Sequence, residues 1–262
     1  MQTWVNPTIS VLLLLAALGF LGGFVDNAFG MGYSLLTPIF LFLGFNPLLV
    51  VPTLLLSQTV AGLSGSVFHH LYKNVDFRER DGRQTRIYLL FTGTGVAGAI
   101  LSATLAVTLP QWFMLLYIGL MLLIVGIIVR FKINFTGGWW KMYAASAIGG
   151  FNKAIAGGGY GPLVTSVQIM CGSKVKSSVG TTQFSEATIS SIGFIIYYVL
   201  NGGFALIPVI QSMVVLVVTG AVAAPMGALL VKRLDEHMAR KAVGVSSIIL
   251  GIITLGRFLL LW

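Results

Sequence analysis

The fold is decided by two related stretches of sequence, GGFVDNAFGMGY at residues 22–33 and GGFNKAIAGGGY at residues 149–160. Both open with Gly-Gly-Phe and close with two spaced glycines and a tyrosine, so the chain contains an internal repeat. Short apolar segments at 34–44 and 160–171 follow them, and each is too short to cross a bilayer as a helix. Each half of the chain is therefore expected to contain a pair of half-helices separated by a glycine break.

The composition is that of an integral membrane protein. Apolar residues make up 56% of the 262 positions and charged residues 9%, against about one quarter charged residues in soluble domains. Helices are expected, because open strands would leave backbone groups unsatisfied in lipid. The expected apolar segments cover residues 8–25, 34–44, 47–70, 87–108, 111–130, 141–156, 160–171, 177–200, 205–231 and 242–262. The predicted fold class is an all-α polytopic membrane protein with two five-segment repeats, residues 1–135 and 136–262.

Basic residues mark the connections on one side of the membrane. The formal net charge of +9 could suggest a nucleic-acid partner, but nearly all Lys and Arg residues lie in four connections between apolar segments. They are Lys73, Arg78, Arg80, Arg83, Arg86, Arg130, Lys132, Lys141, Lys174, Lys176, Lys232, Arg233, Arg240 and Lys241, whereas the connections near 46, 110 and 201–203 have none. The positive-inside rule assigns the basic loops to the cytoplasm. We therefore expect a multi-pass protein of the cytoplasmic (plasma or inner) membrane, with inverted repeats, both termini outside and no nucleic-acid partner.

Inverted repeats with interrupted helices are characteristic of secondary transporters, whose substrate site lies near the midplane where the broken segments meet. For a single cluster, glycines that merely allow close helix packing are the alternative explanation. Two matched clusters, each followed by a short apolar segment, favour a binding site. We expect the broken or re-entrant half-helices to meet near mid-membrane and to bind a small anionic substrate.

Very few charged residues fall within apolar segments. They are Asp26, Lys153, Glu186 and Arg257, and Arg257 is close enough to the C-terminus to reach the surface. A charge at mid-bilayer costs about 2.5–3.5 kcal/mol on insertion scales, so the other three are expected to face a polar cavity or a partner. Asp26 and Lys153 occupy equivalent repeat positions and could pair, which would be a purely structural bridge in the simplest case.

A role in binding is favoured for Lys153 because it precedes a glycine break. The N-terminus of the following half-helix presents free N–H groups and a positive dipole, so an ammonium beside it makes an anion site. Glu186 and Asp26 are the candidates for coupling transport to a proton or a cation.

A polar stripe in the third segment of each half completes the predicted site. Hydroxyl and amide groups can replace the water shell of an oxyanion at lower cost than a second buried charge. Ordinary interhelical hydrogen bonding, near 0.6 kcal/mol per bond, is the alternative. A shift of one residue in the alignment pairs Ser57 with Ser185 and Gln58 with Glu186. The candidate substrate-binding residues are Asn27, Gly30, Gly32, Tyr33, Ser57, Gln58, Asn152, Lys153, Gly157, Gly158, Gly159, Tyr160, Thr181, Gln183 and Ser185.

The glycine stretches also resemble those of a known family. Residues 22–33, followed by Leu35-Leu36-Thr37-Pro38, and the later Gly157-Gly158-Gly159-Tyr160-Gly161-Pro162 are similar to the repeated signature of the TauE/SafE sulfite-exporter family. The resemblance covers essentially the whole chain and implies transport of a sulfur-containing anion, such as sulfite or an organosulfonate, across the cytoplasmic membrane. Met31 departs from the pattern, because the second cluster has Gly158 at that place. This weakens the expectation of close backbone approach to a ligand in the first half.

Other classes of function fit the sequence less well than transport. Cys171 is the only cysteine, which excludes an intramolecular disulfide and a cysteine-based metal site, and no cofactor or metal is expected. Residues 62–65, GLSG, superficially resemble the serine motif of intramembrane proteases, but His69 and His70 are badly spaced to face Ser64. Both histidines are instead expected at the membrane interface without a special role. We therefore expect no enzyme, while a channel, another small anion such as a carboxylate, and a homo-oligomer stay open.

Overall fold

The computed structural model describes residues 7–77, 82–131, 138–200 and 209–231, together with residues 241, 245, 248–249, 251–256 and 259 near the C-terminus. Within these ranges the regular structure is helical, with no strand. The helices are α2 (Ile9–Phe29), α3 (Gly32–Phe42), α4 (Pro47–Leu71), α5 (Arg83–Ala106), α6 (Gln111–Arg130), α7 (Trp139–Ala156), α8 (Tyr160–Met170), α9 (Val175–Leu200) and α10 (Ile210–Leu230). The predicted all-α class is confirmed for this part of the chain.

Each predicted apolar segment up to residue 231 corresponds to one of these helices. The differences are at helix ends: α2 continues to Phe29, so Asp26 lies in its last turn, and α5 begins at Arg83. The predicted segment 242–262 is described only in part. The loop at 201–203 and basic residues in three other loops lie outside the described residues, among them Arg78, Arg80, Lys132, Lys232, Arg233 and Arg240.

Among the described helices, α2, α4, α5 and α10 are long and apolar enough to cross a membrane. The outer face of α10 carries exposed apolar side chains, as expected for a helix in contact with lipid. Val214, Val218, Val222 and Met226 recur every fourth residue, and each is more than half exposed. An apolar stripe of this kind suits lipid rather than water. The chain is a multi-pass membrane protein.

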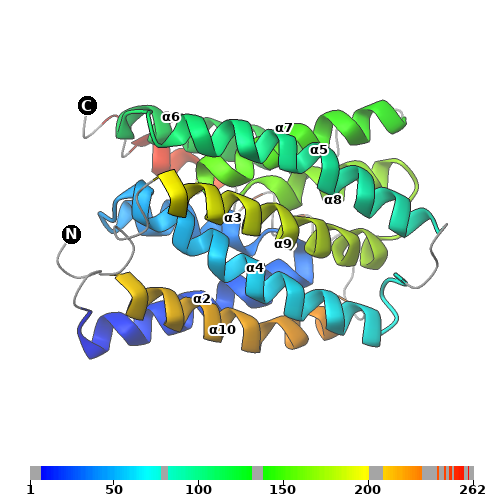
Figure 1. The fold of residues 1–262 in the computed structure, drawn as a ribbon, viewed down its shortest axis with the longest axis horizontal. Coiled ribbons are helices and arrows are strands. Elements are labelled where there is room, and N and C mark those ends of the chain that lie inside the picture. Colours follow the sequence, from blue (N-terminus) through cyan, green and yellow to red (C-terminus); the bar gives the residue numbers. More distant parts are fainter. Residues whose placement is uncertain are drawn as a thin grey trace.

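The helices run roughly along the long axis of the molecule (Figure 1). α2 and α10 lie along one edge, α5, α6 and α7 along the opposite edge, and α4 and α9 between them. α2 enters from one end and α3 turns back towards that end, whereas α7 and α8 form the same kind of pair from the other end. Each short pair therefore enters and returns at a single end of the molecule.

Both breaks are made by a glycine in the left-handed region. Gly30 ends α2 with a φ of 76°, and its N–H donates to Asp26 O over 2.6 Å. Gly157 ends α7 with a φ of 72°, and its N–H donates to Lys153 O over 2.8 Å. A residue with a Cβ pays roughly 1–2 kcal/mol in this conformation. Both glycine clusters therefore interrupt helices as predicted, although α2 runs on to Phe29 rather than ending at residue 25.

Two other glycines of the same stretches serve helix packing. A Cβ on Gly23 would lie 2.4 Å from Gly220 O of α10, and a Cβ on Gly150 would lie 2.0 Å from Gly95 O of α5. α2 and α10 thus meet backbone to backbone, and so do α7 and α5. The packing explanation holds for these two positions, and the break explanation for Gly30 and Gly157.

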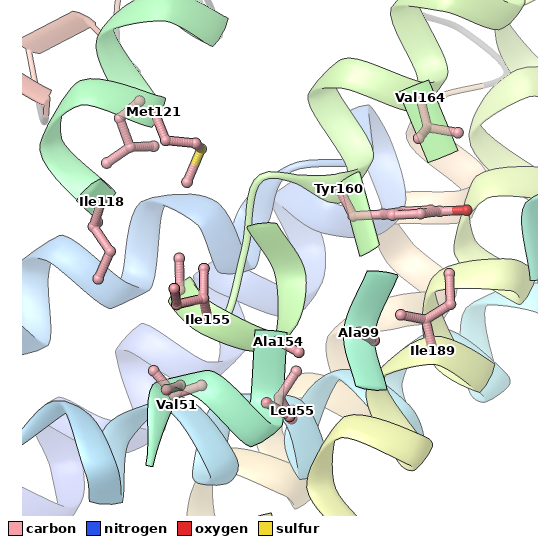
Figure 2. Packing of buried hydrophobic residues seen from close by; sticks show 14 of the residues in the cluster. Val51, Leu55, Ala99, Ile118, Met121, Ala154, Ile155, Tyr160, Val164 and Ile189 are labelled. Carbon is pink, nitrogen blue, oxygen red and sulfur yellow. The ribbon is translucent and has the colours of Figure 1, made fainter. Parts of the chain in front are cut away.

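Apolar side chains surround the end of α7. Figure 2 shows Ala154 and Ile155 of α7 close to Val51 and Leu55 of α4, with Ile118 of α6 in the same cluster. All five residues are buried. Since protein interiors are close-packed, this cluster holds the last turn of α7, and with it Lys153, in a fixed position.

Candidate functional site

The two glycine breaks contact each other inside the molecule. A Cβ on Gly158 would lie 2.4 Å from Ser34 Cα, and one on Gly161 would lie 1.5 Å from Gly30 O. The N–H of Gly159 donates to Ser34 Oγ over 2.6 Å. The prediction that both clusters interrupt helices and face each other is confirmed, and their position near mid-membrane stays a prediction.

Gly32 and Met31 show how the first break differs from the second. A Cβ on Gly32 would lie 1.8 Å from Gly22 O, so α3 turns back directly against α2. The Met31 side chain is buried in the apolar core around α7. The backbone of the first half therefore approaches its own helix closely, whereas Gly158 of the second half approaches the opposite half.

A buried ion pair lies next to this contact. Lys153 Nζ, in the last turn of α7, is 2.8 Å from Glu186 Oε1 of α9, and both side chains are buried. Glu186 Oε2 is 3.2 Å from the place where a Cβ on Gly161 would lie, so the carboxylate faces the start of α8. Lys153 Nζ also lies 5.3 Å from the centre of the Tyr33 ring, within the range of a cation–π interaction. The positive charge predicted to bind an anion is thus buried and already paired.

The direct pair of Asp26 with Lys153 that the repeat positions suggested does not form. Asp26 Oδ2 instead accepts a hydrogen bond from Gln183 Nε2 over 2.9 Å, and the same nitrogen donates to Asp26 O over 2.6 Å. Asp26 is near enough to Lys153 for an electrostatic interaction, but the ion pair is made with Glu186. The reason is that equivalent repeat positions are related by symmetry, whereas direct contact depends on which neighbouring helix a side chain faces.

The cluster has more acceptors than donors. Two carboxylates share one ammonium, and Glu186 Oε2, Gln58 Oε1 and Asn27 Oδ1 are buried oxygens without a hydrogen-bond donor among the described residues. A buried polar atom left unpaired costs about 1–3 kcal/mol. An acceptor-rich cluster of this kind has the chemistry to accommodate a proton or a cation.

Two tyrosine–serine pairs hold the short helices in place. Tyr33, in the first turn of α3, bonds through its hydroxyl to Ser57 Oγ of α4 over 2.8 Å. Tyr160, the first residue of α8, donates from its hydroxyl to Ser185 Oγ of α9 over 3.1 Å. All four side chains are buried. The alignment of Ser57 with Ser185 therefore corresponds to matched contacts, which fix each half-helix to the helix that follows it.

Gln58 and Gln183 join three helices around the charged groups. Gln58 Nε2 of α4 donates to Gln183 Oε1 of α9 over 3.3 Å, and Gln183 Nε2 in turn donates to Asp26 of α2. Both amides are fully buried. They therefore belong to the charged cluster, and their expected role in substrate binding stays a prediction.

Thr37 and Thr165 were missed in the sequence. A Cβ on Gly157 would lie 2.9 Å from Thr37 Oγ1, and one on Gly30 would lie 2.9 Å from Thr165 Oγ1. Each hydroxyl thus belongs to the short helix of one half and lies at the break of the other half. The available signal was their repeated position, shortly after the tyrosine of each stretch.

His69 is buried within the protein near the end of α4, and its depth in the membrane stays a prediction. Its side chain is fully buried, with Nε2 3.0 Å from Asn27 O and Nδ1 3.1 Å from Asn74 Nδ2. Since Asn74 supplies an N–H and the Asn27 carbonyl can only accept, the neutral ring carries its proton on Nε2. The signal was helical spacing, because His69 falls on the face of Gly62 and Ser66, which are also buried.

Three predicted site residues lie at the edge of the cluster or away from it. Asn27 Nδ2 donates to Gly23 O over 2.9 Å, and its Oδ1 faces Gly65 of α4. Asn152 accepts a hydrogen bond from the hydroxyl of Tyr117 and so faces α6. Thr181 lines a separate pocket at the end of the molecule where α9 begins. These residues are therefore less suited to direct contact with a ligand beside Lys153.

Comparisons with known proteins add a family and one relative. A family model described as "Sulfite exporter TauE/SafE" matches residues 15–254. The probable membrane transporter protein YtnM of Bacillus subtilis (strain 168) is 28% identical over 201 residues, which is 71% of this chain and 64% of the relative. The chain thus matches less than two thirds of the length of this curated relative. No solved structure matches.

Proposed function

This chain belongs to the sulfite exporter TauE/SafE family, and from that premise we propose that it is a secondary transporter for a small sulfur-containing anion, such as sulfite or an organosulfonate. The observation that carries the proposal is Lys153, a fully buried ammonium in the last turn before the break between α7 and α8. A buried cation at a helix break, with hydroxyl groups at both breaks, has the chemistry to replace the water shell of an oxyanion.

Binding of the anion would compete with Glu186 for Lys153. In the structure the Lys153 ammonium is paired with the Glu186 carboxylate at 2.8 Å, so the anion has to displace this carboxylate. The displaced carboxylate would then be unpaired in a buried site that already contains Asp26, at a cost of several kcal/mol. Protonation of Glu186 removes that cost. We therefore infer that one proton enters the cluster together with the anion, which makes Glu186 the coupling residue.

The surroundings of Glu186 are consistent with this exchange. The charged and titratable groups that face it come from four helices: Asp26 of α2, Tyr33 of α3, Lys153 of α7 and Tyr160 of α8. Lys153 is the only cation among them. When a monovalent anion, such as a sulfonate or hydrogensulfite, takes Lys153 and a proton neutralises Glu186, the total charge of the cluster stays the same, so no uncompensated charge is carried through the protein.

Matched contacts support the proposal that residues 1–135 and 136–262 are inverted repeats. The pairs Tyr33–Ser57 and Tyr160–Ser185 correspond to each other, as do the close approaches of Gly23 to α10 and of Gly150 to α5. The two short helix pairs enter from opposite ends of the molecule (Figure 1). With basic loops inside, both termini would face outside and the breaks would lie near mid-membrane.

A protease is a poor alternative on structural grounds. Ser64 Oγ donates to Ala221 O over 3.2 Å, while both ring nitrogens of His69 are engaged elsewhere. Ser64 and His69 therefore do not form a nucleophile–base pair. A carrier for a carboxylate, or a channel, differs from the proposal in substrate or coupling and is separated by the experiment that follows.

The test combines ligand binding with driven transport. The purified protein is screened by thermal stability with sulfite, ethanesulfonate and acetate, because a ligand of the folded state at 100 times its dissociation constant adds about 2.7 kcal/mol. Proteoliposomes are then assayed for sulfite and ethanesulfonate uptake under an imposed pH gradient. Stabilisation by the sulfur oxyanions and uptake against their concentration gradient, driven by protons, are expected. Stabilisation by acetate alone would exclude the proposed substrate class. Flux that does not depend on the pH gradient would exclude the proposed coupling.

A further inference from the structure

A second polar site lies where α4–α5 and α8–α9 are connected. It is a pocket of about 750 Å³, well over the size of a single small oxyanion. Among the described residues, four cationic side chains and the carboxylate of Asp76 line it: Lys73, Arg83, Lys174 and Lys176 are the cations. The guanidinium of Arg83 donates to Cys171 O over 2.5 Å, which ties the two connections together. The pocket is therefore a preformed, strongly positive concavity.

The floor of the pocket has polar groups that are ready for a ligand. Thr181 and Asn74 are 1% and 3% exposed, and Thr181 Oγ1 and Asn74 Oδ1 have no hydrogen-bond partner among the described residues. Both residues line the pocket. Buried polar atoms are normally paired, so the Thr181 hydroxyl has an O–H to donate to an oxyanion in the pocket, whereas Asn74 Oδ1 can only accept and would not bind one.

A chain of hydrogen bonds leads from this floor to the glycine breaks. Gln168, which lines the pocket, donates to Thr182 Oγ1 over 2.8 Å, and Thr165 Oγ1 donates to the same oxygen over 3.0 Å. Thr165 in turn lies at the break made by Gly30. Amide and hydroxyl groups thus connect the pocket to the break at Gly30.

From this geometry we propose that the pocket is an anion-binding vestibule, in which the transported oxyanion is captured on the cytoplasmic side before it reaches Lys153. The proposal rests on the proposed function for the identity of the anion and on the positive-inside rule for the side. Its physical basis is steering: a concavity with one sign of charge concentrates counter-ions and raises their association rate by about 10- to 1,000-fold. An anionic lipid headgroup has the same chemistry and is the competing occupant.

The vestibule can be tested apart from transport with a cysteine reporter. Ser177 lines the pocket, so Ser177→Cys in a Cys171→Ser background places a single thiol there. The anionic reagent sulfonatoethyl methanethiosulfonate should label it faster than its trimethylammonium analogue, and ethanesulfonate should protect it. Lys174→Gln with Lys176→Gln should lower the anionic-to-cationic rate ratio at least about tenfold. Arg130→Gln, an exposed cation outside the pocket, is the matched control and should leave the ratio unchanged.

Further variants and ligands identify what the pocket binds, and they separate this proposal from the proposed function. Thr181→Val should weaken protection by ethanesulfonate roughly 2- to 12-fold, the effect of one hydrogen bond. In the labelling assay, protection by phosphatidylglycerol in nanodiscs, but not by free ethanesulfonate, would overturn the vestibule in favour of a lipid site. Lys153→Met should abolish transport yet keep the protection of the reporter. If transport survives Lys153→Met while protection persists, the proposed function fails and the vestibule stands.

Transport kinetics supply the final criterion. Lys174→Gln with Lys176→Gln should raise the half-saturation concentration about tenfold with little change in maximal rate, because steering acts on capture. The difference from the native protein should disappear near 1 M salt, where the Debye length is about 3 Å. An unchanged labelling ratio together with unchanged half-saturation would refute the vestibule.

Discussion

Removing the charge of Lys153 separates a role in anion binding from a structural role. In Lys153→Met the ammonium is lost while Glu186 and Asp26 stay in place, and these residues are 1% and 0% exposed. The native pair at 2.8 Å is direct and buried, so its loss leaves an uncompensated buried carboxylate. Breaking such a pair from one side costs about 3–5 kcal/mol. We expect a lower melting temperature in detergent, by roughly 10 °C if about 3 °C is lost per kcal/mol.

A second substitution should restore the fold without restoring binding. In Lys153→Met with Glu186→Gln, the unpaired carboxylate is replaced by an amide of the same shape, so most of the lost stability should return. Asp26→Asn in place of Glu186→Gln should restore less, because Asp26 is already held by Gln183 rather than by Lys153. This order of rescue follows from the observed pairing and would be reversed if Asp26 were the partner.

Anion binding decides between the two roles. A hydrogen bond to a charged group contributes about 1.5–3 kcal/mol, so the folded double variant should bind radiolabelled sulfite roughly 10- to 150-fold more weakly than the native protein. Binding is measured on detergent-purified protein at equal folded fraction, with melting curves as the control for folding. Near-native affinity in the folded double variant would show that Lys153 is structural, and the proposed site would then be wrong.

Three further predictions address coupling, topology and the breaks. Glu186→Gln should abolish accumulation driven by a proton gradient but preserve anion exchange, and accumulation at the native rate would remove the coupling role. Cysteines introduced singly by Arg80→Cys and Gly202→Cys, at positions outside the described residues, should be labelled from the cytoplasm and from outside respectively; labelling from one side would rule out inverted repeats. Gly157→Ala should destabilise the protein by at least roughly 1–2 kcal/mol, because of its φ of 72°. Gly93→Ala is the control: this glycine lies within a helix with open space around it, so the substitution should stabilise the protein by up to about 1 kcal/mol. Equal effects of the two substitutions would argue against a special backbone conformation at Gly157.

Local features of the fold could be predicted from the sequence because they depend on neighbours along the chain. Gly30 and Gly157 end their helices through their own φ angles, which a glycine adopts at no steric cost. The lengths of α3 and α8, both too short to span, follow from the apolar runs after those glycines. The match of Ser57 with Ser185 required only an alignment of the two halves, and both serines bond to the equivalent tyrosine.

Contacts across the bundle could not be predicted in the same way. The partner of Lys153 depends on the rotation and depth of α9 relative to α7, and no local pattern contains these quantities. Thr181 and Thr182 show the consequence, since they are adjacent in sequence. Thr182 takes part in the hydrogen-bond chain towards the breaks, whereas Thr181 faces the pocket lined by the basic residues. A stripe of polar residues in the sequence does not reveal which of them turns to which neighbour.

The sequence by itself thus determined that this chain is a helical membrane protein, where its helices are interrupted and which three charged residues are buried. These properties follow from hydropathy, segment length and the conformational freedom of glycine, all of which act within one segment. Only the tertiary structure decided that Lys153 pairs with Glu186, that His69 is buried against Asn27, and that the basic connections enclose a pocket. These properties depend on distances between helices far apart in sequence, which are fixed when glycine contacts and apolar packing set how closely the helices approach.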